Sequence, residues 1–367
     1  MSRPFDQARA MPPSVYTSED FLALETSSIF ANEWFCVGRA DALANSGDYV
    51  TLDLANQPII VLRDQEGALK AMSNVCRHRM STLLEGRGNT RSIVCPYHAW
   101  TYNLDGSLRG APAMDQNAGF CKSDYRLPDI RCEEWLGWVF VTLNPDVPPV
   151  ARQLSKVEEL VNDYNMANYS ETFFETHIWN TNWKVLAENF MESYHLPVCH
   201  AGTIGGLSKL NEMICPPGED AFNYHTILKD ETLKIEMAHP SNKRMEGERR
   251  RTTFLLAIYP SLLITLTPGN FWYLHPQGVG QVRIGFGGGM SNDYANDPDA
   301  QDKFRQLKAL LDEVNVEDKG CTEKVYRGLC SQAAAPGHLS HLERPNYDFA
   351  QYINARLQAA AKQQVQT

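Results

Sequence analysis

The sequence lacks the features expected of a membrane-spanning, exported or nucleic-acid-binding protein. It contains no uninterrupted apolar run of about 18 residues, the length that a membrane-spanning helix needs. Its first residues, MSRPFDQARAMPPSVYTSEDF, lack the apolar segment of a secretory signal. The net charge of −10 disfavours nucleic acid as the main partner. We therefore predict a cytoplasmic protein that binds neither a membrane nor nucleic acid.

The cysteine content does not indicate a disulfide framework. The nine cysteines are an odd number, and only Cys76 and Cys95 stand at ligand spacing. In a cytoplasmic protein the simplest state of the others is a reduced, packed thiol. This expectation applies to Cys36, Cys121, Cys132, Cys199, Cys215, Cys321 and Cys330.

What the sequence does contain is two short pairs of soft metal ligands, Cys76-x-His78 and Cys95-x2-His98. Such loops suit an asymmetric [2Fe–2S] cluster, in which two thiolates bind one iron and two imidazoles bind the other. The alternative is a Cys2His2 zinc site, which uses the same ligands in a tetrahedron. The next residues, WTYNLDG, predict a strand that enters an Asp-Gly hairpin turn. These surroundings favour the iron–sulfur interpretation.

A second pair of histidines, His195 and His200, lies downstream. Residues 183–195 are compatible with a helix, which Pro197 is predicted to end so that both imidazoles turn toward one point. Glu192 is predicted to share the helical face of His195. Two histidines and one distant carboxylate would form the facial triad of a mononuclear Fe(II) oxygenase. The plainer alternative is that both histidines are ordinary polar core residues.

The carboxylate of such a triad must come from a distant part of the sequence. A long helix is predicted from about Pro298 to Leu329, with an apolar face that includes Phe304, Leu307 and Leu311. Four acidic residues at or beside this helix are candidates for the third ligand, and the residues alone do not separate them. They are Asp312, Glu313, Glu317 and Asp318.

The 367 residues are enough for two domains with a large core. Residues 1–35 are predicted to form an arm and a short helix, and 36–148 an antiparallel β domain that ends at a proline-rich boundary. Residues 149–367 are predicted to form a catalytic α+β domain, an antiparallel sheet covered by helices. It is expected to begin with a helix over 150–168. Residues 201–250 suit a mobile loop or a plain surface excursion.

The motifs together resemble those of the catalytic α subunit of a Rieske non-haem iron oxygenase. The resemblance runs over essentially the whole chain and rests on Cys76-x-His78, Cys95-x2-His98, Glu192-x2-His195-x4-His200 and the acidic Glu317-Asp318 segment. It implies a Rieske β domain and a helix-grip catalytic domain. It also implies that Cys76, His78, Cys95 and His98 bind the [2Fe–2S] cluster, and that His195, His200 and Asp318 bind Fe(II).

The family resemblance also has implications for electron transfer. Glu192 matches the carboxylate that bridges a cluster histidine and an iron histidine, usually between neighbouring subunits of a homotrimer. A separate flavin or iron–sulfur reductase would bring electrons from NAD(P)H, because the chain has no flavin-binding glycine fingerprint and no plant-type cysteine cluster. A simple Rieske electron-transfer protein is the alternative of another class.

The substrate is predicted less directly. A Glu at position 192 resembles the branch that acts on carnitine, choline and betaines, whereas Tyr326 departs from it. For such a cation, Phe271, Trp272, Tyr273, Tyr259 and Trp179 are candidates for an aromatic cage. The alternative is hydroxylation of an aromatic carboxylate, for which Arg249, Arg250 and Arg251 are candidate anchors if they are not a solvated loop or docking patch.

Overall fold

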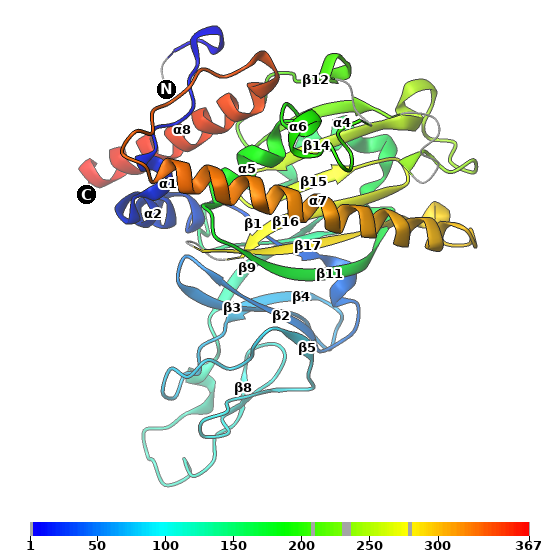
Figure 1. The fold of residues 1–367 in the computed structure, drawn as a ribbon. Coiled ribbons are helices and arrows are strands. Elements are labelled where there is room, and N and C mark those ends of the chain that lie inside the picture. Colours follow the sequence, from blue (N-terminus) through cyan, green and yellow to red (C-terminus); the bar gives the residue numbers. More distant parts are fainter. Residues whose placement is uncertain (1–2, 207–209, 230–235, 278–280, 367) are drawn as a thin grey trace. The chain divides into compact units, whose positions relative to one another are not determined.

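The computed structural model describes residues 3–206, 210–229, 236–277 and 281–366 (Figure 1). Contacts divide the chain into two compact units. One unit contains residues 30–151, and the other contains 1–29 together with 152–367. Among the described residues, no helix is both long enough and apolar enough to span a membrane.

The unit of residues 30–151 is built from two antiparallel sheets. The larger has the strand order β1-β10-β9-β4-β3-β2-β5, and the smaller has the order β6-β7-β8. The strands are β1 (Phe35–Arg39), β2 (Asp48–Leu54), β3 (Gln57–Arg63), β4 (Leu69–Ser73), β5 (Arg87–Asn89), β6 (Ile93–Val94), β7 (Thr101–Tyr102), β8 (Leu108–Gly110), β9 (Asp129–Trp135) and β10 (Trp138–Thr142). The predicted Asp-Gly turn is confirmed, since Gly106 has φ of 88° between β7 and β8.

The second unit contains one seven-stranded antiparallel sheet, with the order β11-β17-β16-β15-β14-β13-β12. Its strands are β11 (Tyr169–Trp179), β12 (Met213–Ile214), β13 (Phe222–Leu228), β14 (Thr252–Ile258), β15 (Leu262–Leu266), β16 (Asn270–Gln277) and β17 (Val282–Ser291). The interpretation of 201–250 as an irregular excursion is therefore wrong for β12 and β13, while 207–209 and 230–235 lie outside the described residues.

The α-helices of the described residues belong to this second unit, apart from α3, which spans the boundary between the two units. They are α1 (Ser14–Thr17), α2 (Glu19–Glu25), α3 (Val150–Gln153), α4 (Ser155–Val161), α5 (Trp183–Met191), α6 (Leu196–Cys199), α7 (Ala300–Leu329) and α8 (Arg344–Gln366). Figure 1 shows the long α7 crossing the sheet, and α5 contacts β13, β14 and β15 as well as α7 and α8. The prediction of α7 is confirmed. The single helix predicted over 150–168 is wrong, because the chain breaks after α4 and Asn165 takes a left-handed φ of 53°.

A buried ion pair fixes the N-terminal helices to α5. Nζ of Lys184 lies 2.8 Å from Oε1 of Glu25, and both side chains are fully buried. The indole N–H of Trp183 donates to Oε2 of the same carboxylate at 3.1 Å. Since an unpaired charge at either position would be costly, the pair specifies how α2 meets the helix that leads into the candidate site.

The reduced state predicted for all seven remaining cysteines is wrong for two of them. Cys199 and Cys321 form a disulfide in the structure, which joins α6 to α7. Cys121 and Cys330 are free but exposed, not packed as predicted. The disulfide depends on how α6 packs against α7, which the spacing of the cysteines along the chain does not reveal.

Candidate functional site

The two Cys–His pairs lie in two loops with the same backbone pattern. In the first, the N–H of Cys76 donates to the carbonyl of Ser81 and the N–H of Met80 donates back to Cys76. In the second, the N–H of Cys95 donates to the carbonyl of Trp100, and the N–H of Ala99 donates to the carbonyl of Cys95. Met80 and Ala99 both take left-handed φ, 53° and 57°. The second loop joins the paired strands β6 and β7, and the first is closed by the isolated bridge between Val75 and Thr82. The matching turns are a scaffold for presenting one Cys and one His apiece.

The four side chains differ in exposure. Cys76 and Cys95 are 1% and 3% exposed and belong to the hydrophobic core of this unit. His78 is half-buried and His98 is exposed, and their ring centroids are 4.8 Å apart. The loops thus place two thiols inside and two imidazoles nearer the surface, the asymmetry expected if each pair binds its own iron.

The asymmetry of these residues suits a two-iron cluster, in which thiolates bind one iron and imidazoles the other. Nδ1 of His78 is buried without a hydrogen-bond partner, as a nitrogen reserved for a metal would be.

The thiol of Cys95 is electrostatically prepared to be a ligand. Burial alone would raise its pKa, but hydrogen bonds from the backbone N–H groups of Tyr97 and His98, and from Cys76, lower it. A lower pKa favours the thiolate, which is the form that binds metals.

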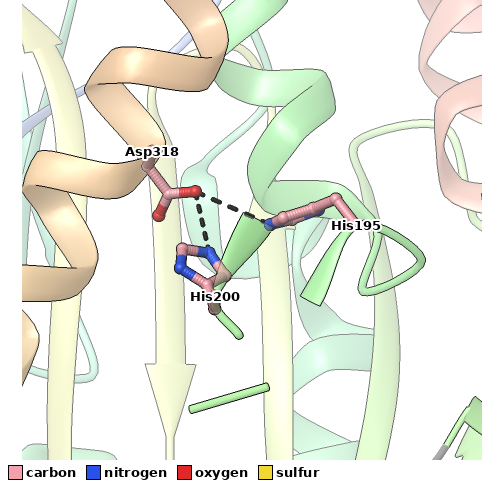
Figure 2. A group of neighbouring side chains, drawn as sticks. All are labelled: His195, His200 and Asp318. Atoms are coloured by element: carbon pink, nitrogen blue, oxygen red, sulfur yellow. Dashed lines mark ion pairs between the residues drawn. The ribbon is translucent and has the colours of Figure 1, made fainter. Parts of the chain in front are cut away.

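In the second unit, His195, His200 and Asp318 converge (Figure 2). Oδ1 of Asp318 lies 3.0 Å from Nε2 of His200 and 3.6 Å from Nε2 of His195. The same oxygen is buried and faces both ring nitrogens, which fits an atom that would share a cation with them. Of the four candidate carboxylates, Asp318 is the one whose oxygen lies close to the Nε2 atoms of both histidines.

Two glutamates hold the histidine rings from behind. Nδ1 of His195 lies 2.6 Å from Oε1 of Glu192, and Nδ1 of His200 lies 2.7 Å from Oε2 of Glu317. Since a carboxylate only accepts, each Nδ1 carries the proton and each Nε2 is left to bind a metal. Burial alone would lower the pKa of His195, but its bonds to Asp318 and Glu192 raise it to about 9. Burial would likewise lower the pKa of His200, which Asp318 and Glu317 raise.

The local backbone differs from the prediction. Helix α5 ends at Met191, and Glu192 is extended, with φ of −129°. Pro197 does not end that helix but lies in the first turn of α6, where its missing N–H is harmless. Glu192 reaches His195 because Oε2 accepts from the backbone N–H groups of Tyr194 and His195, which folds the turn around the carboxylate.

A third histidine, His225 on β13, supports this turn and was not identified from the sequence. Its Nε2 lies 2.7 Å from Oγ of Ser193, between Glu192 and the first metal-facing histidine. Burial lowers the pKa of His225 to about 3, so the ring is neutral. A lone histidine in a strand gives no pattern by which this contact could have been predicted.

The triad lies in the wall of a cavity of about 110 Å³ between the sheet, α5 and α7. The wall is largely aliphatic, and α7 contributes Leu307, Leu310, Leu311 and Val314 to it. Of the five predicted cage aromatics only Trp272 lines the cavity, together with Phe190, whose ring stands perpendicular to it at 6.0 Å.

The aromatic-cage prediction is wrong for Phe271 and Tyr273 because strand residues alternate between faces. Trp179 and Tyr259 also lie outside the cavity wall. Trp272 and Leu274 of β16 face the cavity, whereas Phe271 and Tyr273 are buried outside it. Gly287 makes room on that other face, since a methyl group there would overlap the ring of Tyr273.

The arginine run does not reach the cavity either. Arg249 pairs with Asp163, and Arg250 donates to four backbone carbonyls of residues 238–245. Arg251 donates to the carbonyl of Lys229 at 3.1 Å. The candidate anchors for an aromatic carboxylate are therefore structural. The cation that does line the cavity, Lys229, was missed, as was its partner Glu236.

Two antiparallel β architectures, one with paired Cys–His loops and one with a two-histidine, one-carboxylate site beside a cavity, define a metal-dependent oxygenase. Residues 33–131 match the family described as Rieske [2Fe-2S] domain, and residues 158–359 match the ring hydroxylating alpha subunit (catalytic domain). The chain belongs to this family of Rieske non-haem iron oxygenases.

Curated relatives agree with this assignment, and solved structures agree with the fold. The chain is 30% identical over 269 residues to the carnitine monooxygenase oxygenase subunit of Escherichia coli (strain K12), covering 71% of this chain and 68% of that protein. It is 29% identical over 369 residues to the chloroplastic choline monooxygenase of Arabidopsis thaliana, covering 94% of this chain and 82% of that protein. The quaternary ammonium Rieske monooxygenase CntA in complex with L-carnitine superposes with a TM-score of 0.81 at 24% identity, covering 96% of each chain. Naphthalene 1,2-dioxygenase with bound indole superposes with a TM-score of 0.76 at 17% identity, covering 96% of this chain and 95% of that chain.

The predicted fold class, enzyme class and cofactors are confirmed. The protein is an oxidoreductase that uses O2, with a Rieske [2Fe–2S] cluster and a mononuclear iron. As an oxygenase subunit it acts on a small molecule with electrons from a reductase. The alternative of a simple electron carrier is wrong, because the catalytic domain matches over 158–359.

Proposed function

We propose that the chain oxidises a C–H bond of a small quaternary ammonium compound in the cavity beside His195, His200 and Asp318. The single observation that carries this proposal is the convergence of these three side chains in the cavity wall, with the buried Oδ1 of Asp318 facing both Nε2 atoms. We assign the mononuclear iron to them; when bound, it would supply O2 activation. The chain's own residues bind the substrate, orient it and exclude water.

The size and lining of the cavity support a small cationic substrate. The cavity measures about 110 Å³, and one water needs roughly 10–15 Å³ on this scale, so there is room for a small metabolite. The perpendicular rings of Trp272 and Phe190 offer π faces to a quaternary ammonium group. Relatives named for carnitine, choline and glycine betaine support the same class. Aromatic hydroxylation is the alternative that the test must address.

The chemistry of an N-methyl substrate gives a distinctive product. Hydroxylation consumes O2, two electrons and two protons, placing one oxygen atom on the methyl carbon and releasing the other as water. The resulting N-hydroxymethyl group loses formaldehyde and a proton, and the nitrogen keeps the electron pair of the broken C–N bond. A tertiary amine and formaldehyde are therefore the expected products.

We assign the [2Fe–2S] cluster to Cys76, Cys95, His78 and His98, which the matching loops, the lowered pKa of Cys95 and the unpartnered Nδ1 of His78 support. Glu192 is assigned to orient His195 and to link it to a cluster histidine of a neighbouring subunit in a homotrimer. Its bond to Nδ1 supports the first part, and the inter-subunit electron transfer named for CntA supports the second. A cytoplasmic location stays a prediction from the sequence.

The test is a substrate screen with the purified holoprotein, NADH and a surrogate Rieske reductase. Carnitine, glycine betaine and choline are compared with benzoate, and formaldehyde, amines and hydroxylated arenes are quantified. The proposal predicts oxygen-dependent consumption of at least one quaternary ammonium compound. Products from the aromatic compound alone would contradict it and support aromatic hydroxylation.

A further inference from the structure

The cavity contains an ion pair that neither metal assignment uses. Nζ of Lys229, at the end of β13, lies 3.5 Å from Oε2 of Glu236, and their side chains are only 15% and 9% exposed. Both line the same cavity as the metal-facing triad. The other carboxylates in the described lining, Glu192 and Asp318, are engaged with the histidines.

This pair is not explained by stability. The surrounding wall is aliphatic, with Ile227, Leu255 and Leu274 from the sheet. Removing two charges from water in such a setting costs about as much as their attraction returns, so an apolar pair would serve the fold equally well. A buried ammonium beside a substrate cavity is instead suited to binding an anion.

The backbone of Lys229 is held in place by two hydrogen bonds. The N–H of Lys229 donates to the carbonyl of Arg251 at 3.0 Å, and the guanidinium of Arg251 donates back to the carbonyl of Lys229 at 3.1 Å. Glu236 is 7% exposed and restrains the head group. Because an ammonium has three N–H donors, an ion pair with one carboxylate leaves capacity for a second anion.

We propose that Lys229 binds a carboxylate group of the substrate and that Glu236 is the positioning residue that holds Lys229 in place. The substrate is then a zwitterion that carries both a quaternary ammonium and a carboxylate, as carnitine and glycine betaine do and choline does not. This inference rests on the proposed function and narrows it.

The distribution of charge in the cavity gives the zwitterion one orientation. The carboxylates of Glu192 and Asp318 lie with the histidines, and Lys229 is the permanent cation among the described lining residues. Like charges repel and opposite charges attract most strongly where water is excluded. The substrate carboxylate therefore lies at Lys229, and the ammonium end turns toward the triad and the Trp272 ring.

The experiment compares a charge-matched pair of ligands on the holoprotein under anaerobic conditions. Calorimetry measures the Kd of glycine betaine and of choline for wild type, Lys229→Met, Lys229→Arg and Glu236→Gln, and aerobic kinetics give KM and kcat. Lys324→Met, an exposed lysine on α7, is the matched control. The visible spectrum of the cluster reports the integrity of the unit of residues 30–151, and choline binding reports the fold of the catalytic unit in every variant.

We expect Lys229→Met to raise the Kd and KM for glycine betaine about 10- to 100-fold, the effect of one lost charge-assisted hydrogen bond, and to leave choline binding unchanged. Lys229→Arg should restore part of the binding. Glu236→Gln should weaken zwitterion binding less than Lys229→Met, and Lys324→Met should change nothing.

Equal effects of Lys229→Met on both ligands, or none on glycine betaine, would overturn the inference while leaving the proposed function standing. If Glu236→Gln weakened choline binding more than glycine betaine binding, the inference would also be overturned, because the ion pair would then recognise the ammonium group of the substrate. If the wild type oxidises no quaternary ammonium compound at all, the proposed function itself fails, and this inference with it.

Discussion

Glu317 and Asp318 are neighbours in sequence, yet the structure gives them different tasks, and replacing Glu317 tests this division. Oε2 of Glu317 accepts hydrogen bonds from Nδ1 of His200 at 2.7 Å and from Oγ1 of Thr203 at 2.6 Å. His200 is only 1% exposed, so no water replaces a lost partner easily. Glu317→Gln keeps the shape of the side chain and removes its charge.

The expected loss follows from the role of such a carboxylate. A partner on Nδ1 fixes the tautomer and the orientation of a ligand histidine and makes its Nε2 more basic, and its removal typically weakens metal binding 10- to 100-fold. That range corresponds to about 1.4–2.7 kcal/mol of iron-binding free energy. Asp318→Ala, by contrast, removes a proposed ligand and should abolish mononuclear iron binding.

The assay is an anaerobic Fe(II) titration of protein depleted of mononuclear iron but retaining its cluster, whose visible spectrum is the internal control. Glu313→Gln, an exposed acid on the same helix, is the matched control and should bind iron as wild type does. Wild-type affinity in Glu317→Gln would refute the positioning role. Full iron content in Asp318→Ala, with none in Glu317→Gln, would make Glu317 the third ligand instead.

Outcomes are expected for three further changes, which are two substitutions and a change of pH. His195→Ala should lose turnover and mononuclear iron while the cluster spectrum persists; a bleached spectrum would show that the variant disrupts more than this site. Glu192→Gln should retain both metals and slow electron delivery, so normal single-turnover transfer would contradict the bridging role. The iron affinity of metal-depleted protein should rise with pH and level off near 9, because a proton competes with iron for His195, whose pKa is raised from 6.5 to about 9. In that metal-free protein the charged ring stabilises the fold fully below pH 6.5 and loses its effect through pH 9, so thermal melts should show a matching decline.

The cluster loops were predictable because their ligands are close together in the sequence. Cys76 and His78, or Cys95 and His98, fall within one turn of chain, so their spacing alone restricts the geometry. The residues alone did not single out the third candidate ligand, and only the family resemblance pointed to Asp318, because it meets the histidines through the packing of α7 on α6. The helix that carries Asp318 was correctly predicted from its periodic apolar face, but which of its four acids faces the histidines became evident only in the fold.

The cavity charges escaped prediction for a different reason. Lys229 and Glu236 lie in a stretch whose polar composition suggested surface, and only the strand β13 carries Lys229 inward. The arginines nearby looked like better anchors, but their donors are used by backbone carbonyls. Composition identifies which charges exist, whereas the sheet register decides which of them face a cavity.

One element, α7, builds part of the cavity wall and also carries the acid that faces both histidines. Leu307 and Asp318 are about 16 Å apart along its axis, on one continuous run of helical hydrogen bonds. Close-packed interiors pass on displacements without absorbing them. A substrate that contacts these leucines therefore contacts the same continuous helix that positions the carboxylate of Asp318.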